Sequence, residues 1–102
     1  MALFDEVDVI IAPATPCAAP AIGQKTFVAG GETLLVRANL GIFTQPISFI
    51  GLPVVAAPVR QQAALPIGVQ IIAAPWREED ALRVAFTLER AGICAAPVAT
   101  QP

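Results

Sequence analysis

Residues 67–91, IGVQIIAAPWREEDALRVAFTLERA, contain the pattern that decides the fold class, an apolar run followed by an amphipathic segment. Ile67 to Ala73 is apolar at nearly every position, which predicts a buried strand. Glu78 to Ala91 is predicted to be a helix, because acidic residues open its first turn and Gly92 follows its last periodic position. A strand followed by an amphipathic helix is an α/β pattern. The apolar stripe of this helix is predicted to consist of Ala81, Leu82, Ala85 and Leu88.

Two more strands are expected N-terminal to this stretch. Val7 to Ala12 is a β-branched run ended by a proline, and Pro53 to Val59 is bounded by prolines, which cannot donate to a sheet ladder. Thr26 to Val36 alternates weakly around Gly30-Gly31, which predicts a hairpin. The sequence thus predicts an α/β architecture with about three strands of a mixed sheet and a long C-terminal helix.

The remaining segments are less regular. Pro13 to Gly23 is rich in proline and alanine without any period, and we expect a loop there. Arg37 to Ile50 is ambiguous, because its apolar spacing suits a helix whereas Gly41 and Pro46 argue against a regular one. We therefore expect an irregular helical segment before Gly51.

The composition is unusually apolar for a small chain. Its 102 residues fit one domain, yet 56% are hydrophobic and only 14% are charged. Ordinary soluble domains are about 45–50% apolar and about 25% charged, and a small domain, with more surface per volume, should be more polar still. The composition therefore resembles the interior of something larger. The net charge of −2 provides no basic field, which argues against nucleic-acid binding.

The apolar excess raises the question of a membrane span. Ala38 to Val59 carries no charged residue and is long enough to cross a bilayer. Pro46, Pro53 and Pro58 interrupt it, however, and the carbonyl groups that they free would have no partner in lipid. We expect no membrane partner. The N-terminus is acidic where a secretory signal needs a basic region, so a cytoplasmic location is expected.

Residue counts exclude most hydrolytic arrangements within this chain. It has no histidine, one serine (Ser48) and one lysine (Lys25). A Ser-His-Asp or Cys-His arrangement is therefore impossible. A serine–lysine pair is possible by count, but Lys25 lies in a polar loop and Ser48 in an apolar segment. We interpret them as a solvated lysine and a backbone-bonded serine, and we assign no catalytic residue.

No metal or cofactor is expected. Cys17 and Cys94 are too few and too far apart in the sequence for a zinc site or a disulfide framework, and we interpret them as two small buried thiols. Gly30-Gly31 lacks the strand–helix context of a phosphate-binding loop. Trp76, beside a proline, is expected to be a packing anchor.

Four segments, in this order, resemble the C-terminal part of the amidase-signature hydrolases. They are Phe4–Pro16, Ile42–Pro46 with Gly51–Pro58, Leu65–Ala73, and Glu78–Arg90. Within that family the sequence is most similar to those of bacterial amidohydrolases that act on small urea-like amides, the carboxybiuret hydrolase type. Gly41 stands where the family's glutamine-dependent amidotransferases carry an acidic residue, and this difference argues against glutamine as the parent substrate.

The resemblance implies the C-terminal part of an α/β/α mixed-sheet fold and hydrolysis of a small amide or urea-like C–N bond. It also implies a serine nucleophile, a cis-serine relay and a lysine base, which cannot be placed here because two serines are required. In the family these residues precede the part that is matched. We therefore expect an incomplete domain that begins at a methionine internal to full-length relatives. Its expected partner is the missing N-terminal part of the amidase domain, and we expect no catalysis by the chain alone.

Five residues are predicted to border the substrate pocket of the intact enzyme, because they sit at loop or element ends, where α/β sites gather. For Pro16 and Phe43, simple turn or core roles are an equal alternative. Three interpretations of the whole chain remain open: a truncated amidase segment, a piece complemented by a separate triad-bearing chain, and an unrelated apolar interaction module. The five predicted residues are Thr15, Pro16, Phe43, Thr44 and Gln45.

Overall fold

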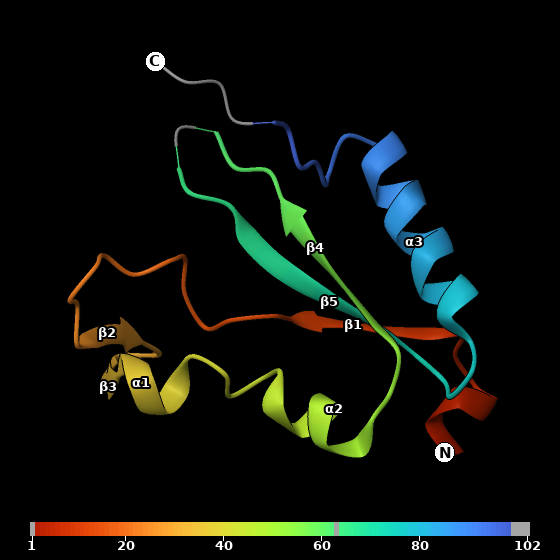
Figure 1. The fold of residues 1–102 in the computed structure, drawn as a ribbon, viewed down its shortest axis with the longest axis horizontal. Helices are drawn as coiled ribbons and strands as arrows, with labels where there is room; N and C mark the ends of the chain where they lie inside the picture. The colour runs from red at the N-terminus through yellow and green to blue at the C-terminus, as the bar shows by residue number, and fades with distance from the viewer. Residues whose placement is uncertain (1, 63, 99–102) are drawn as a thin grey trace.

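A computed structural model describes residues 2–62 and 64–98 of the chain, and Figure 1 shows their arrangement. The chain contains both helices and strands and ends in a long helix, which confirms the α/β class. A short 3₁₀ helix, η1, precedes the first strand. The elements are η1 Ala2–Asp5, β1 Val9–Pro13, β2 Thr26–Ala29, β3 Glu32–Leu35, α1 Val36–Asn39, α2 Gln45–Ile50, β4 Val54–Val59, β5 Ile67–Ala73 and α3 Glu78–Arg90.

The three predicted strands form one sheet in the order β1-β5-β4. β5 lies in the middle, paired on both sides, and Gln70 to Ala73 are buried. The proline-containing strands β1 and β4 flank it, as expected for residues that cannot donate to a ladder. Both pairings are antiparallel. The parallel strands of a mixed sheet, which the family resemblance implies, are therefore not among the strands described here.

α3 packs on one face of this sheet. Its Ala81 is almost fully buried and joins Ala57, Ile71, Ala73 and Cys94 in the core. Figure 1 shows α3 on one side of the three strands, with α1 and α2 on the other side. The segment after α3 turns back to β4, where Cys94 bridges Val59.

One position of the predicted helix stripe was wrong. Ala81, Ala85 and Leu88 face the core, but Leu82 is 59% exposed and Val84 packs on the core instead. Residues 81, 84, 85 and 88 follow the three- and four-residue spacing of a single helix face. Leu82 lies about 100° around the helix from Ala81 and so falls outside that face.

The end of α3 matches the prediction from Gly92. Gly92 has a positive φ of 77°, which residues other than glycine rarely adopt. The amide of Ile93 donates to the carbonyl of Leu88 at 3.0 Å, and that of Gly92 donates to Glu89 at 3.0 Å. These two bonds form a Schellman motif, which satisfies the last carbonyl groups of the helix.

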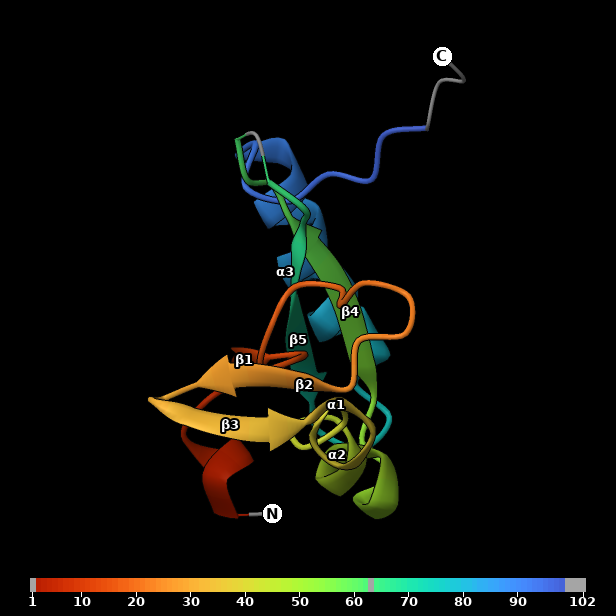
Figure 2. The same ribbon diagram turned by 90° about the vertical axis from the view of Figure 1, so that its left-hand side faces the viewer.

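The hairpin around Gly30-Gly31 is confirmed. Both glycines have positive φ, 58° and 79°, as a two-residue hairpin turn with the twist of its strands requires. β2 and β3 form a separate two-stranded sheet, in which Phe27 is buried. Figure 2 shows this hairpin beside α1, and Figure 1 places it at the end of the molecule away from α3.

The ambiguous segment before Gly51 consists of two short helices with a turn between them. α1 ends at Asn39, and α2 begins at Gln45, where Pro46 lies in the first turn and has no need to donate. Gly51 ends α2 in the left-handed conformation. The first strand also differs slightly from its prediction, because β1 runs from Val9 to Pro13 rather than from Val7 to Ala12.

The molecule is open for its size. Its solvent-accessible surface is 7649 Å², whereas a folded chain of this mass exposes about 5,500 Å². Its radius of gyration is 15.3 Å, against about 13 Å for a compact domain of this length. No helix within residues 2–62 and 64–98 combines the length and the apolar character needed to cross a membrane.

Candidate functional site

The predicted site residues lie in two segments that one buried side chain connects. Thr15 and Pro16 follow β1, while Phe43, Thr44 and Gln45 lie at the start of α2. Nε2 of Gln70, in the central strand, donates to the carbonyl of Pro13 at 3.0 Å and to that of Phe43 at 2.8 Å. The backbones of both segments therefore come within reach of a single carboxamide. The structure thus brings the two sets together through a residue that the sequence prediction did not name.

Gln70 is 2% exposed and projects from the sheet face opposite α3. Its neighbours along β5, Val69 and Ile71, pack toward α3, and successive side chains of a strand alternate between faces. Its cross-strand partners are Ala12 of β1 and Ala56 of β4, both small residues. The only sequence signal for Gln70 was a single amide within an apolar strand.

The first segment continues the sheet ladder past Pro13. The amide of Ala14 donates to the carbonyl of Gly68 at 3.0 Å, and a Cβ built on Gly68 would lie 3.0 Å from that of Ala14. Thr15 Oγ1 then donates to the carbonyl of Cys17 at 2.7 Å and closes the turn. Thr15 and Pro16 line a hollow of about 380 Å³ at the ends of β1 and β5, and Cys17 lines it with them.

The second segment is organised by the carbonyl of Gly41. The amides of Thr44 and Gln45 donate to it at 3.2 and 2.9 Å, which satisfies donors at the start of α2. Thr44 is half-buried, whereas Phe43 is 40% exposed and Gln45 is also exposed. None of these three residues lines the hollow beside Thr15. The two segments therefore share a backbone anchor but not one continuous hollow within this chain.

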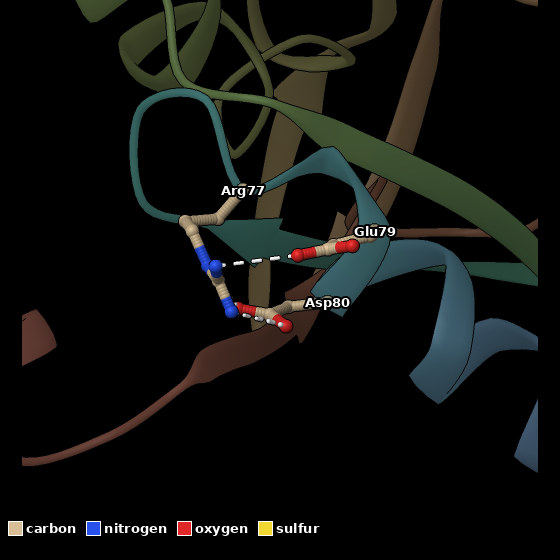
Figure 3. Close-up of polar contacts among 3 residues, drawn as sticks. All are labelled: Arg77, Glu79 and Asp80. Carbon is tan, nitrogen blue, oxygen red and sulfur yellow. Dashed lines mark hydrogen bonds and ion pairs between the residues drawn. The ribbon is translucent and has the colours of Figure 1, made fainter.

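A second polar cluster lies at the start of α3 (Figure 3). Arg77 donates through Nε and Nη2 to the two oxygens of Asp80, at 2.9 and 3.1 Å, and Nη1 lies 3.2 Å from Glu79 Oε1. The hydrogen bond to Asp80, and then the negative charges of Asp80 and Glu79, raise the pKa of Arg77 above its ordinary value. The guanidinium therefore stays charged throughout the neutral range and fixes the first turn of α3.

Trp76 is not a packing anchor within this chain, contrary to the prediction. It is 89% exposed and has a φ of 65°, a conformation that non-glycine residues rarely adopt. It lines a hollow of about 540 Å³ between the Gly51–Val55 segment and α3, together with Leu82. The residue type and the neighbouring proline, on which the prediction rested, do not specify which segment an indole packs against.

The potential nucleophiles show no catalytic arrangement. Ser48 and Lys25 are both exposed, as expected for a solvated lysine. Cys94 is buried, as predicted, but Cys17 is only half-buried. In the described part of the chain, no group of three or more histidine, cysteine or acidic side chains could hold a metal ion. The arrangement can shape and border a pocket, but these residues supply no acid–base pair.

Comparison with known proteins connects this geometry to a family. The family model described as Amidase matches residues 1–82. The chain is 53% identical over 57 residues to the 1-carboxybiuret hydrolase subunit AtzE of Pseudomonas sp. (strain ADP), and the match covers 56% of this chain and 12% of that protein. It is 39% identical over 98 residues to a glutamyl-tRNA(Gln) amidotransferase component of Zymomonas mobilis, covering 94% of this chain and 19% of that protein.

Solved structures agree. A structure described as an unexpected vestigial protein complex that reveals the evolutionary origins of an s-triazine catabolic enzyme matches with a TM-score of 0.88 and 46% identity. That match covers 95% of this chain and 22% of the other chain. A crystal structure of an amidase matches with a TM-score of 0.78 and 26% identity, over 84% of this chain and 20% of that one. The chain thus spans 12% to 22% of the length of these relatives, and it belongs to the amidase family.

Proposed function

We propose that this chain acts as the C-terminal segment of an amidase domain that hydrolyses a C–N bond of a small amide or urea-like compound. The observation that carries the proposal is the fit of 95% of this chain to 22% of a related chain, at a TM-score of 0.88. Together with a single serine and no histidine, this fit favours a segment that shapes the enzyme while another part supplies the nucleophile.

The surface supports this division of roles. Leu82 and Phe86 on α3 are 59% and 57% exposed, and Trp76 is 89% exposed. Leu82 borders two adjacent hollows between β4 and α3, the one beside Trp76 and a second one beside Phe86. Apolar surface gathered in this way marks a site of interaction. We propose that the remainder of the amidase domain covers it.

The proposed substrate is an uncharged or carboxylated urea-like amide rather than glutamine. The resemblance places Gly41 where the glutamine-dependent amidotransferases carry an acid, and the Gly41 carbonyl is occupied by amides of α2. No acidic side chain occurs among the five predicted border residues, so they offer no carboxylate to an ammonium group. We propose that Thr15, Pro16, Phe43, Thr44 and Gln45 border the pocket for this substrate.

Reconstitution tests the proposal. The chain is co-expressed with the part of a carboxybiuret hydrolase relative that it does not match, and ammonia release from 1-carboxybiuret is measured. We expect activity only when both parts are present, and none from this chain alone. Activity of the chain alone would contradict the proposal. A chain that unfolds cooperatively as a monomer and does not associate with the co-expressed part of the amidase would favour the interaction-module alternative instead.

A further inference from the structure

Among the residues that the structure describes, Gln70 is the one polar side chain in the buried set. We infer that Gln70 is a positioning residue whose carboxamide fixes the two border segments of the substrate pocket relative to each other. The role as a pocket border rests on the proposed function. The link between the segments rests on the hydrogen bonds of Gln70 alone.

The geometry uses the full donor capacity of the side chain. A carboxamide nitrogen carries two hydrogens, and Nε2 of Gln70 faces two carbonyl oxygens, those of Pro13 and Phe43, at 3.0 and 2.8 Å. These acceptors are distant in sequence, and each belongs to a predicted border segment or lies next to one: Phe43 is itself a predicted border residue. Thr15 follows Pro13 by two positions, and Thr44 follows Phe43 directly. One side chain therefore determines the spacing between both segments.

Side chains of similar size cannot replace this function. Glutamate in its ionised form has no donor and would direct a negative charge at two carbonyl oxygens. Methionine fills a similar volume but would remove the donor that both part-buried carbonyl groups share, and an unpaired polar group away from water is costly. Ala12 and Ala56, opposite Gln70 on the neighbouring strands, have methyl side chains that carry no hydrogen-bond donor.

Nuclear magnetic resonance of the 102-residue chain, labelled with ¹³C and ¹⁵N, tests the inference directly. Scalar coupling across a hydrogen bond connects a donor nitrogen to the acceptor carbonyl carbon. We expect correlations from Gln70 Nε2 to the carbonyl carbons of both Pro13 and Phe43. A side chain that only fills space would give neither. Absence of either correlation in the parent chain would overturn the inference, whatever the state of the rest of the molecule.

Substitution supplies the second readout. Gln70→Met is expected to raise amide hydrogen exchange roughly tenfold in both residues 14–17 and residues 41–45, because both acceptors lose their donor. Gln61→Met is the matched control, since Gln61 Nε2 also donates to a carbonyl, that of Leu65 at 2.7 Å, but at an exposed site. Its effect should stay within the loop between β4 and β5.

A response to Gln70→Met in only one of the two segments would also overturn the inference. Should this variant not fold, the couplings in the parent chain decide the question. The outcome is independent of the reconstitution assay. Correlations without reconstituted activity would support the link that Gln70 makes between the two segments and contradict the proposed function. Reconstituted activity without correlations would support the proposed function and contradict the link.

Discussion

Gly68 shows how a single residue determines the shape of the candidate site. It lies on β5 opposite the start of the loop that carries Thr15, and its carbonyl accepts the amide of Ala14. A Cβ at position 68 would meet the Cβ of Ala14 at 3.0 Å, closer than side-chain carbons normally approach. Glycine is therefore favoured here by the close packing of β5 against the loop that follows β1, and not by backbone conformation.

We predict that Gly68→Ala destabilises the chain by about 1–3 kcal/mol, as overpacking generally does. The variant should also displace the loop that lines the hollow beside Thr15. Urea unfolding measures the first effect, and chemical shifts of residues 14–17 measure the second. The double variant Gly68→Ala/Ala14→Gly removes the facing methyl group and should recover most of the lost stability. Equal stability of the parent and Gly68→Ala would contradict the packing argument.

For single residues, the sequence predicted which residues lie at the ends of elements, but not which groups they contact in the folded chain. Thr15 and Phe43 were predicted as site residues from their places at element ends, and the structure puts their segments together. Gln70 was missed because its role depends on two carbonyl groups far away in the sequence. Leu82 and Trp76 were placed wrongly in the interior, since the side of a helix that is covered depends on elements that no local pattern specifies.

The elements were more predictable, because the signals that begin and end them are local. The apolar run of β5, the acidic first turn of α3 and the paired glycines of the β2–β3 hairpin each act within a few residues. The segment 37–50 could not be resolved from its sequence. Pro46 is compatible with the first turn of a helix but not with its interior, and only the position where α2 begins decides between the two.

The Schellman motif at the end of α3 depends on the left-handed conformation of Gly92. Gly92→Ala should lower the free energy of unfolding by about 1 kcal/mol, because an L-residue is strained at a φ of 77°. Gly92→Asn is the matched control, since asparagine tolerates the left-handed conformation better, and its loss should be smaller. Thermal unfolding followed by circular dichroism measures both. Identical losses for the two variants would show that backbone strain is not the cause.

For the whole molecule, the excess of exposed surface and the apolar composition have one explanation. The chain has a core between α3 and the sheet, yet it exposes 7649 Å², well above the value for a compact domain of its mass. The exposed apolar side chains of α3 and its preceding turn lie beside β4, and there they border two hollows. A sheet and helix with this surface are suited to pack against further layers of an amidase domain.

This surface leads to a prediction about the isolated chain. We expect the isolated chain to fold and to bind strongly a dye that reports exposed apolar surface, because the apolar side chains of the face formed by α3 and β4 are exposed. Leu82→Gln should reduce dye binding and weaken reconstitution with the rest of the domain, while the secondary structure is retained, since Leu82 contributes little to the core of this chain. Arg83→Gln, at the adjacent exposed position, is the matched control and should change neither. If instead the parent chain binds little dye, its exposed apolar side chains do not form the interaction surface that we propose. If Leu82→Gln then reconstitutes as well as the parent, the face formed by α3 and β4 is not where the rest of the domain packs.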